Sequence, residues 1–510
     1  MARYLLAHDL GTSADKATLF DLEGALIASS ERSYPVSYCC GGLGAEQNAA
    51  MWWDAFCQNN FAVLAGRNPR DVAAIAISGQ MMACLPLDQS GVPLRPCMIW
   101  ADRRAEAEAA YLQEQISART YYTITGNCPS ANYTAEKVLY LKRHEPAVWE
   151  KTWKYLQPKD YINFRLTGRA ATDPSDAGHT HMYDIFSRSW SDKILGVIGL
   201  TKEQLPEVID AGEPVGEVSA AAALECGLPA GTLVVQGAGD GRAAMLGAGV
   251  LDPGDAYVSL GTSSWFTAAT DRPNMDPDSG LYKGLSLKKG GYINGGTMQA
   301  GGLSYDWFLR RISALTADSP AKDLYAAAED LIRASSPGAG GALFMPYILG
   351  ERAPWFDHTA NGAFLGLSQQ SSRADLARSV MEGVALHLAL IMNRAEKLDA
   401  VRSVRVIGGG AKSEVWLQIL ADVFQKENQK PSVDLGAGSL GTAVLAGVGA
   451  GVYTDVSAVK VIQHCSRTYE PRREYAALYN ELRILLEEAY LALRSVNGRL
   501  TKLRQNGEGI

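Results

Sequence analysis

The sequence predicts an α/β protein made of two related halves, and three observations support this. Short apolar runs alternate with segments whose apolar residues recur at helical spacing, which is typical of α/β domains. The tetrapeptide Leu-Gly-Thr-Ser occurs at 10–13 and again at 260–263, each time after a short apolar run. With 510 residues the chain has room for about two to four domains. A repeated motif in the same local context indicates two halves of related design.

The first half is expected to open with a β-hairpin. Residues 4–8 and 18–20 are short apolar runs with a glycine turn between them and another after the second. Residues 72–77 form a further predicted strand that ends at Ser78-Gly79-Gln80. An Ala- and Glu-rich segment from 103 to about 115 is predicted to be helical.

The same order of predicted strands and glycine turns begins again near residue 230. Residues 233–235 are predicted to be a strand that leads into a glycine-rich turn at 237–241. Residues 256–260 form the strand before the second Leu-Gly-Thr-Ser, and residues 404–407 form another strand.

The strand at 404–407 is followed by a third glycine turn and two predicted helices. Gly408-Gly409-Gly410 comes first, then a helix with Ser413 as its N-cap. The last helix is expected from 473 to about 495.

We place the domain boundary near residue 250. The prediction is an N-terminal domain over 1–250, a C-terminal domain over 251–495 and a polar tail over 496–510. Each domain is expected to contain a five-stranded α/β core.

Composition excludes several classes of protein. Lys and Arg number 48 against 55 Asp and Glu, so the formal net charge is −7 and nucleic acid is not expected as a partner. The eight cysteines form no C-x-x-C pair, which is typical of a reduced cytoplasmic protein. No apolar run approaches the ~18 residues of a membrane span, and the N-terminus lacks the apolar core of a signal peptide. We therefore expect a cytoplasmic protein without a membrane partner.

Three glycine turns are candidates for nucleotide binding. Gly11-Thr12-Ser13 (the first loop) and Gly261-Thr262-Ser263 (the second loop) combine bare backbone with hydroxyl groups, which suits phosphate. Facing each other across a cleft, they would hold a polyphosphate from both sides. The turn at 408–410 could accept a flat ring or a sugar. Each turn taken alone has the simpler interpretation of being only a turn.

Phosphoryl transfer also needs a carboxylate for the attacking hydroxyl and Mg²⁺ for the phosphates. Asp9 and Asp240 each stand where an apolar strand gives way to glycine. Asp9, beside the first loop, suits a water-mediated contact with Mg²⁺, and Asp240 suits the general base. The alternative for both is a carboxylate that caps its own turn.

These residues together resemble the FGGY family of carbohydrate kinases, over nearly the whole chain. The most specific element is Gly362-Ala-Phe-Leu-Gly366-Leu followed by Asp375-Leu-Ala-Arg-Ser-Val-Met-Glu382, which resembles the family's C-terminal signature. The resemblance implies a two-lobed actin-like ATPase (ribonuclease H-like) fold with duplicated α/β domains and a central cleft. It implies ATP as a substrate and Mg²⁺ as a cofactor.

The resemblance also assigns roles to individual residues. The catalytic base would be Asp240, and Asp9 would contact the metal through water. The residues implied to bind ATP are Gly11, Thr12, Ser13, Lys16, Gly261, Thr262, Ser263, Gly409, Gly410, Ala411 and Ser413. Those implied to bind the sugar are Gln80, Met81, Met82, Trp100, Asp102, Arg104, Asp240 and Arg242.

Several of the implied sugar contacts have structural alternatives. Met81 and Met82 could fill a core, and Trp100 could be a core side chain rather than a stacking surface. Asp102 and Arg104 could form an ion pair with each other. Arg242 could be a solvated or ion-paired helix residue, or a cation that favours an acidic sugar or a keto-sugar hydroxyl.

Within the family the resemblance is closest to xylulose kinases, with departures. Ser78-Gly-Gln-Met81-Met82 is similar to their S-G-Q-M-H, but Met82 replaces the His, and Gly241-Arg242 replaces Asn-Ala. In the N-terminal signature Thr134, Lys137 and Leu141 fit, whereas Asn132 and Tyr140 depart from it.

The implied reaction is transfer of the γ-phosphate of ATP to a hydroxyl of a ketopentose, with D-xylulose expected to give D-xylulose 5-phosphate. Ribulose, gluconate and glycerol remain alternative acceptors. An actin-like ATPase without a sugar acceptor is the alternative of a different class. Small-molecule sugar and ATP are the expected partners, and a homodimer is left open.

Overall fold

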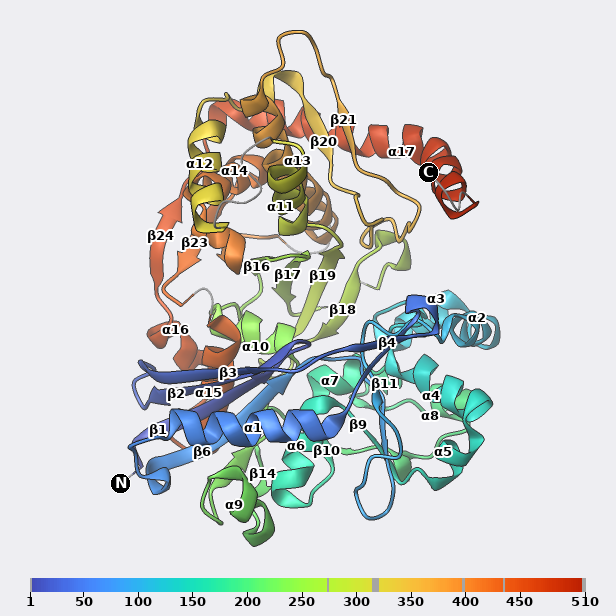
Figure 1. The fold of residues 1–510 in the computed structure, drawn as a ribbon, viewed down its shortest axis with the longest axis vertical. Coiled ribbons are helices and arrows are strands. Elements are labelled where there is room, and N and C mark those ends of the chain that lie inside the picture. The colour runs from blue at the N-terminus through green and yellow to red at the C-terminus, as the bar shows by residue number, and fades with distance from the viewer. Residues whose placement is uncertain (1, 273–274, 314–320, 397–399, 434–435, 507–510) are drawn as a thin grey trace. The chain divides into compact units, whose positions relative to one another are not determined.

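The computed structural model describes residues 2–272, 275–313, 321–396, 400–433 and 436–506 (Figure 1). The chain divides into two compact units, which are described separately. The first comprises Met1–Leu251, Lys283–Tyr292 and Gly436–Gln463; the second comprises Asp252–Tyr282, Ile293–Leu435 and His464–Ile510. Within the described ranges, no helix combines the length and the apolar character that crossing a membrane would require.

The first unit contains a six-stranded mixed sheet. Its hairpin strands β1 and β2 pair antiparallel, and β6 pairs parallel to β1. The predicted strands at 4–8, 18–20, 72–77 and 233–235 are confirmed. In order across the sheet the strands are β14 (Pro214–Glu217), β15 (Leu233–Val235), β6 (Val72–Gly79), β1 (Tyr4–Leu10), β2 (Ala14–Asp21) and β3 (Leu26–Ser33).

The second unit contains most of a seven-stranded sheet of related design, and Lys283–Leu285 of the edge strand β18 (Tyr282–Leu285) are assigned to the first unit. β16 pairs antiparallel with β17 and parallel with β22, which repeats the relation of β1 to β2 and β6. In order the strands are β18 (Tyr282–Leu285), β19 (Tyr292–Met298), β17 (Ser264–Thr270), β16 (Asp255–Leu260), β22 (Ser403–Ile407), β23 (Glu427–Pro431) and β24 (Cys465–Tyr469).

The two strand orders confirm the duplicated α/β fold. Five neighbours, β3-β2-β1-β6-β15, correspond to β19-β17-β16-β22-β23. The expected five-stranded cores are therefore too small: β14 extends the first sheet, and β18 and β24 extend the second. These edge strands are short or polar, so they lack the apolar pattern by which the central strands were found.

Helices cover the sheets and follow short connections. In the first unit they are α1 (Ala49–Val63), α2 (Glu106–Gln115), α3 (Ala118–Thr125), α4 (Thr134–His144), α5 (Pro146–Lys151), α6 (Pro158–Thr167), α7 (Pro174–Gly178), α8 (Asp192–Ile198), α9 (Ala220–Cys226), α10 (Asp240–Gly247), α15 (Ala437–Gly449) and α16 (Val459–Ile462). In the second they are α11 (Gly302–Arg311), α12 (Ala321–Arg333), α13 (Arg373–Glu396), α14 (Glu414–Phe424) and α17 (Ala476–Asn506).

Small two- and three-stranded sheets complete both units. The three-stranded sheet is formed by β4 (Ser37–Cys39), β5 (Gly44–Gln47) and β8 (Cys97–Met98). The pairs are β7 (Leu85–Leu87) with β9 (Lys154–Leu156), β10 (Ala171–Thr172) with β13 (Glu207–Val208), β11 (Tyr183–Asp184) with β12 (Ser189–Trp190), and β20 (Leu343–Met345) with β21 (Ala363–Leu365).

The alternation of side chains along β1 places its polar residues on opposite faces of the first sheet. Leu6 and Leu10 belong to the buried cluster that α1 covers, and His8 packs against Phe56 of that helix. His8 is fully buried and bonds to both Asp15 and Asn60, so it is a satisfied core histidine. Because successive strand residues point to opposite sides, Asp9 projects from the other face, toward α15.

The predicted domain boundary near residue 250 leaves part of the first unit outside the N-terminal domain. Lys283–Tyr292 and Gly436–Gln463 belong to it although they follow the boundary in sequence. The α15 helix crosses α10 so closely that a Cβ on Gly247 would lie 1.7 Å from the Ala437 carbonyl oxygen. The expected polar tail at 496–510 also differs, since α17 continues to Asn506 and only 507–510 lie outside the described residues. Asn497 is buried, which a polar composition did not reveal.

Candidate active site

Asp9 stands near the carboxyl end of β1, in the first unit, where it meets two other elements. Its Oδ1 accepts a hydrogen bond from the Ser78 hydroxyl at 3.3 Å, since Ser78 is its register partner on β6. A Cβ on Gly438, at the start of α15, would lie 3.2 Å from Asp9 Oδ2. Sequence reasoning missed this helix start because more than four hundred residues separate it from Asp9.

Asp240 is the first residue of α10, directly after the Gly237–Gly239 turn. Its Oδ1 accepts a hydrogen bond from the Gly241 N–H at 2.6 Å. Burial and the negative charge of Asp9 raise the pKa of Asp240 to about 7, against the opposing effects of Gly241 and Arg242. A carboxylate with a pKa near neutrality is suited to accept a proton at the pH of the cell. Asp240 also caps its own turn through the Gly241 N–H, as the alternative predicted, and this does not exclude its role as a base.

The pKa of Asp9 is raised as well, by burial and by a different charge. Burial and the charge of Asp15 raise the pKa of Asp9, while Ser78 and Lys16 oppose that rise. Lys16 lies opposite Asp9 in the β1–β2 pairing. Two acids with raised pKa values, Asp9 and Asp240, mark a candidate functional site.

The first loop is fixed by hydrogen bonds from four side chains. Tyr34 Oη donates to the Gly11 carbonyl at 2.7 Å, and Gln80 Nε2 reaches the same oxygen at 3.4 Å. Gln47 Nε2 donates to the Thr12 carbonyl at 2.6 Å, and Trp100 Nε1 donates to the Thr12 hydroxyl at 2.8 Å. The loop is therefore rigidly placed between its two strands.

The backbone N–H groups of the first loop differ in their hydrogen bonding. The Gly11 N–H is used within the turn, donating to the carbonyls of Asp9 and Ala14. Within the described ranges, the N–H groups of Thr12 and Ser13 make no backbone hydrogen bond. Contact with a phosphate would therefore come from these two N–H groups rather than from Gly11.

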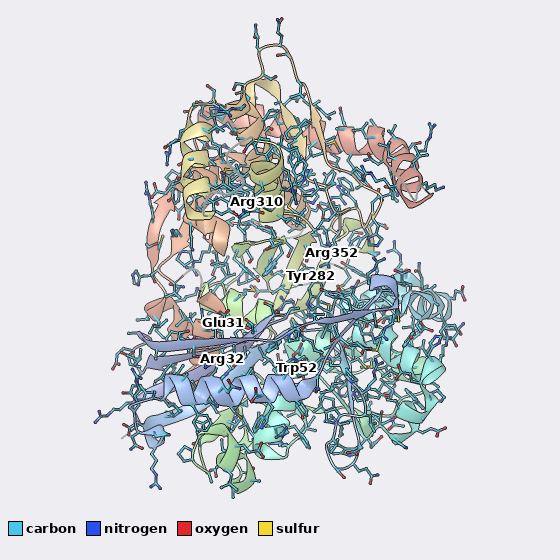
Figure 2. All side chains as sticks on the ribbon, in the orientation of Figure 1. Glu31, Arg32, Trp52, Tyr282, Arg310 and Arg352 are labelled. Carbon is cyan, nitrogen blue, oxygen red and sulfur yellow. The ribbon has the colours of Figure 1, made fainter. Side chains whose placement is uncertain are left out.

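Gln47 connects the first loop to the predicted sugar residue Gln80. Its Oε1 accepts from Gln80 Nε2 at 2.7 Å and from the indole of Trp52, which lies on α1 (Figure 2). Gln80 Oε1 is buried and has no hydrogen-bond partner in the described ranges. Sequence reasoning missed Gln47 because its partner loop lies about 35 residues earlier.

Met81 and Met82 are placed differently. Met81 is buried, and its thioether fills the space where a Cβ on Gly239 would stand, at 2.4 Å, next to Asp240. Met82 adopts a left-handed backbone conformation with φ 62°. Its carbonyl accepts a hydrogen bond from Lys137 Nζ at 2.8 Å, which holds the uncommon conformation. The core interpretation of Met81 is confirmed, and sugar contact by either methionine stays a prediction.

Asp102 and Arg104 form the ion pair that the sequence left open. Arg104 Nη2 lies 2.7 Å from Asp102 Oδ2, and Asp102 also accepts from the Ala45 N–H at 2.9 Å. Arg104 makes a second ion pair with Glu46, the neighbour of Gln47. Asp102 is fully buried and holds β5 in place, and contact of Asp102 or Arg104 with the sugar stays a prediction.

Arg242 is buried, so the prediction that it is a solvated helix residue is wrong. It is only 4% exposed, and its Nε donates to the Leu285 carbonyl at 3.2 Å. Its Nη2 lies 3.1 Å from His179 Nε2, while His179 Nδ1 bonds to the Ser175 carbonyl. Burial and the charge of Arg242 lower the pKa of His179 to about 3, so the histidine is neutral and accepts from the guanidinium.

Hydrogen bonds from Lys137 and Asn132 hold Trp100 in place, and Trp100 in turn bonds to the first loop. Lys137 is fully buried, and its Nζ donates to the Asn132 carbonyl at 2.5 Å as well as to Met82. Asn132 Nδ2 in turn donates to the Trp100 carbonyl at 2.8 Å. Asn132 was noted in the sequence only as a departure from a signature, yet it belongs to a continuous set of contacts from Lys137 to Thr12.

In the second unit the second loop and the glycine turn after β22 lie together. Their strands are paired neighbours, and a Cβ on Gly410 would lie 2.5 Å from Leu260 Cγ, just before Gly261. The Gly408 backbone has φ 93°, which only glycine adopts readily. Gly302 and Leu303 donate to the carbonyls of Gly261 and Thr262 and fix that loop.

The remaining residues predicted to bind ATP have local structural roles. Ser413 is the N-cap of α14, as predicted, and its hydroxyl accepts from the Trp416 N–H at 3.2 Å. Ala411 is fully buried beside the turn, whereas Gly409 is exposed and has open space around it. The roles of these residues in binding ATP stay predictions.

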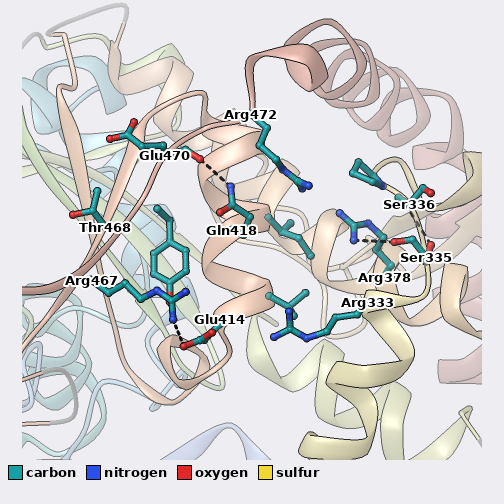
Figure 3. Close-up of a pocket in the computed structure, with 14 residues that line it drawn as sticks. Arg333, Ser335, Ser336, Arg378, Glu414, Gln418, Arg467, Thr468, Glu470 and Arg472 are labelled. Atoms are coloured by element: carbon teal, nitrogen blue, oxygen red, sulfur yellow. Dashed lines mark hydrogen bonds and ion pairs between the residues drawn. The ribbon is translucent and has the colours of Figure 1, made fainter.

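A separate pocket of about 800 Å³ lies in the second unit between α12, α14 and β24 (Figure 3). Four arginines line it, and each has an acidic partner. Arg467 pairs with Glu414, and Arg472 Nη2 lies 2.6 Å from Asp422. Because these charges are neutralised in pairs, the pocket is not a strong anion site. Arg378, from the signature segment 375–382, lines this pocket, but none of the residues implied to bind ATP or the sugar does.

Comparison with known proteins supports a kinase. The N-terminal domain of the FGGY family of carbohydrate kinases matches residues 4–247, and the C-terminal domain matches residues 256–450. The xylulose kinase of Bacillus subtilis (strain 168) is 30% identical over 510 residues, covering 99% of this chain and 100% of that protein.

Two solved structures from Lactobacillus acidophilus are similar over almost the whole chain. The gluconate kinase has a TM-score of 0.91 at 26% identity and covers 98% of this chain and 100% of its own. The ligand-bound xylulose kinase also has a TM-score of 0.91, at 27% identity, with coverage of 98% and 99%. Since both family domains match in order, this chain belongs to the FGGY family of carbohydrate kinases.

Proposed function

We propose that this protein transfers the γ-phosphate of ATP to D-xylulose and forms D-xylulose 5-phosphate. The observation that carries the proposal is Asp240: a half-buried carboxylate at the start of α10, with its pKa raised to about 7 beside a second acid, Asp9. The full-length similarity to a xylulose kinase supports the choice of acceptor.

Asp240 would act on the attacking hydroxyl of the sugar. The hydroxyl oxygen forms a bond to the γ-phosphorus as the bond from that phosphorus to the β,γ-bridging oxygen breaks, and the hydroxyl proton passes to the Asp240 carboxylate. A positioned general base of this kind contributes roughly 10²–10⁴-fold. The Gly241 N–H keeps one Asp240 oxygen oriented, which leaves the other for the substrate.

The residues around Asp9 fit Mg²⁺ bound together with ATP. Its carboxylate accepts only the Ser78 hydroxyl in the described ranges, and it suffers repulsion from Asp15 that a cation would relieve. Mg²⁺ commonly takes one or two carboxylates, phosphate oxygens and water, so a cage of several protein ligands is not needed. When bound, Mg²⁺ would neutralise charge on the phosphates.

The buried polar groups favour a neutral sugar over an acid such as gluconate. Arg242, the added cation, already donates to Leu285 and to the neutral His179. Gln80 Oε1, a buried acceptor without a partner in the described ranges, suits a hydroxyl group and would repel a carboxylate. A ketopentose supplies hydroxyls without adding a buried negative charge.

A panel of acceptors tests the proposal. We expect D-xylulose to give the highest kcat/KM in a coupled assay for ADP, ahead of ribulose, glycerol and gluconate, with a 5-phosphate as product. Gluconate as the best substrate would contradict the choice of sugar but retain the kinase. ATP hydrolysis that is equally fast with and without any acceptor would contradict phosphoryl transfer itself.

The pKa of Asp240 predicts a pH dependence. A base must be ionised to act, so kcat/KM for the sugar should rise about tenfold per pH unit below the pKa and level off above it. We expect the midpoint near pH 7, the value to which burial and Asp9 raise the pKa. The profile should be measured from pH 5.5 to 9 at saturating Mg²⁺ and ATP. A flat profile through this range would contradict the assignment of Asp240.

A further inference from the structure

The short helix α7 presents two polar side chains that bond to the chain on either side of Asp240. Ser175 lies in the first turn of α7, and its hydroxyl accepts a hydrogen bond from the Gly239 N–H at 3.3 Å. Gly239 directly precedes Asp240 and is the N-cap of α10. His179 directly follows α7, and its Nε2 accepts from Arg242 Nη2 at 3.1 Å, two residues after Asp240. Because positions 175 and 179 are four residues apart, both side chains lie on one face of the helix.

The turn before Asp240 is also held by β6. Gly239 forms an isolated parallel bridge with Gly79 at the end of that strand. A Cβ on Gly237 would lie 1.8 Å from the Ile77 carbonyl oxygen, so the turn packs directly on the strand. Contacts with both β6 and α7 therefore fix the path of the backbone that leads into Asp240.

The α7 helix is itself anchored by a buried lysine and its acidic partners. Lys159 Nζ, on α6, lies 2.9 Å from Asp173 Oδ1 and 3.1 Å from Asp176 Oδ2, and all three side chains are fully buried. Asp173 is also the N-cap of α7 and accepts from the Ser175 N–H at 2.8 Å. Since loss of one partner from a buried ion pair is strongly destabilising, these contacts give Ser175 and His179 a firm support.

Ser175 also determines which nitrogen of His179 is free to accept a hydrogen bond. The Ser175 carbonyl oxygen lies 3.0 Å from His179 Nδ1 and can only accept, so Nδ1 holds the proton of the neutral ring. The lone pair of Nε2 is then available to the Arg242 guanidinium. Arg242 is held at a second point by the Leu285 carbonyl. The contacts of α7 thus extend into the first turn of α10, which begins with Asp240.

We propose that Ser175 and His179 are positioning residues that hold Asp240 in the orientation that proton transfer requires. The inference rests on the proposed function, in which Asp240 is the general base. Ser175 acts through the backbone of Gly239, and His179 acts through Arg242. Because a misplacement of about 1 Å can cost roughly 10²-fold in rate, loss of either contact should lower kcat and leave the KM for ATP nearly unchanged.

Steady-state kinetics of the full chain, with ATP and the best acceptor of the panel, tests the proposal. Ser175→Ala and His179→Leu should each lower kcat about tenfold with a nearly unchanged KM for ATP. His179→Gln keeps a neutral acceptor and should retain nearly the wild-type kcat. A matched control is Ser191→Ala, because Ser191 is also buried and its hydroxyl also accepts from a backbone N–H, that of Ile194 at 3.4 Å. The control should keep the wild-type kcat.

Two results of these measurements would overturn the proposal. Equal kcat values for Ser175→Ala and Ser191→Ala would show that the contact with Gly239 does not serve catalysis. Equal losses in His179→Gln and His179→Leu would show that the acceptor for Arg242 is not what matters at this position.

A double-mutant cycle with Asp240→Asn separates positioning of the base from a general effect on the fold. Once Asp240 has lost its basic oxygen, its orientation no longer affects proton transfer, so Ser175→Ala should lower kcat by less than about twofold in that background. The same loss in the Asp240→Asn background as in the wild type would overturn the inference and leave the proposed function standing. Near-normal kcat of Asp240→Asn itself would overturn both.

Discussion

Replacement of Asp240 by Asn is expected to lower kcat by about two orders of magnitude or more while ATP and sugar still bind. The amide keeps the size of the side chain and can still accept from the Gly241 N–H, but it has no basic oxygen. The loss should therefore fall on kcat, with the KM values nearly unchanged. Steady-state kinetics with D-xylulose and ATP, together with calorimetric binding of each, measures both effects.

The same variant should be more stable than the wild type at pH 8. The pKa of Asp240 is raised in the folded protein, so the folded state holds a proton more tightly than the unfolded state, and stability falls as pH rises toward 7. The Asn side chain does not ionise, so the variant does not lose stability in this way. A higher melting temperature with lower kcat would separate a catalytic effect from unfolding, and near-normal kcat would mean that Asp240 is not the base.

Replacement of Gly11 by Val is expected to raise the KM for ATP at least about tenfold, with a smaller change for the sugar. A Cβ on Gly11 already lies 3.3 Å from the Ala14 carbonyl oxygen, so the valine methyl groups must displace the loop or project beside Thr12 and Ser13. The N–H groups that we expect to hold phosphate would then be misplaced.

A matched control for Gly11→Val is Gly196→Val in α8, where no atom lies within 4 Å of an added Cβ. That variant should keep the wild-type KM for ATP. A folded Gly11→Val enzyme with an unchanged KM for ATP would show that the first loop does not contact phosphate.

The central strands of both sheets could be predicted from sequence because they are buried and end at glycine. Residues 72–77 and 404–407 form apolar runs whose position in the sheet follows from that burial. The edge strands could not be found in this way. β24 has four exposed residues among its five, and β14 has one buried residue among its four, so neither shows the pattern of a core strand.

The candidate site was predictable where local sequence determines it. Asp9 and Asp240 stand at a strand end and a helix start beside glycine turns, and the structure places them close enough for the charge of Asp9 to raise the pKa of Asp240. The contacts that position the first loop could not be predicted, since they join residues far apart in sequence. Gln47, Asn132 and Lys137 are ordinary polar residues until the fold brings them against Thr12, Trp100 and Met82.

The late position of α15 has a consequence for biosynthesis. Gly436–Gln463 completes the first unit, yet about 210 residues separate Leu251 from Gln463. At roughly 5–20 residues per second, the ribosome needs about 10–40 s to deliver this segment after the rest of the N-terminal sheet has emerged. During that interval the face of β1 and β6 that α15 covers, including the surroundings of Asp9, has no helix over it. The nascent chain must therefore keep an apolar sheet surface from associating with other chains until synthesis is almost finished.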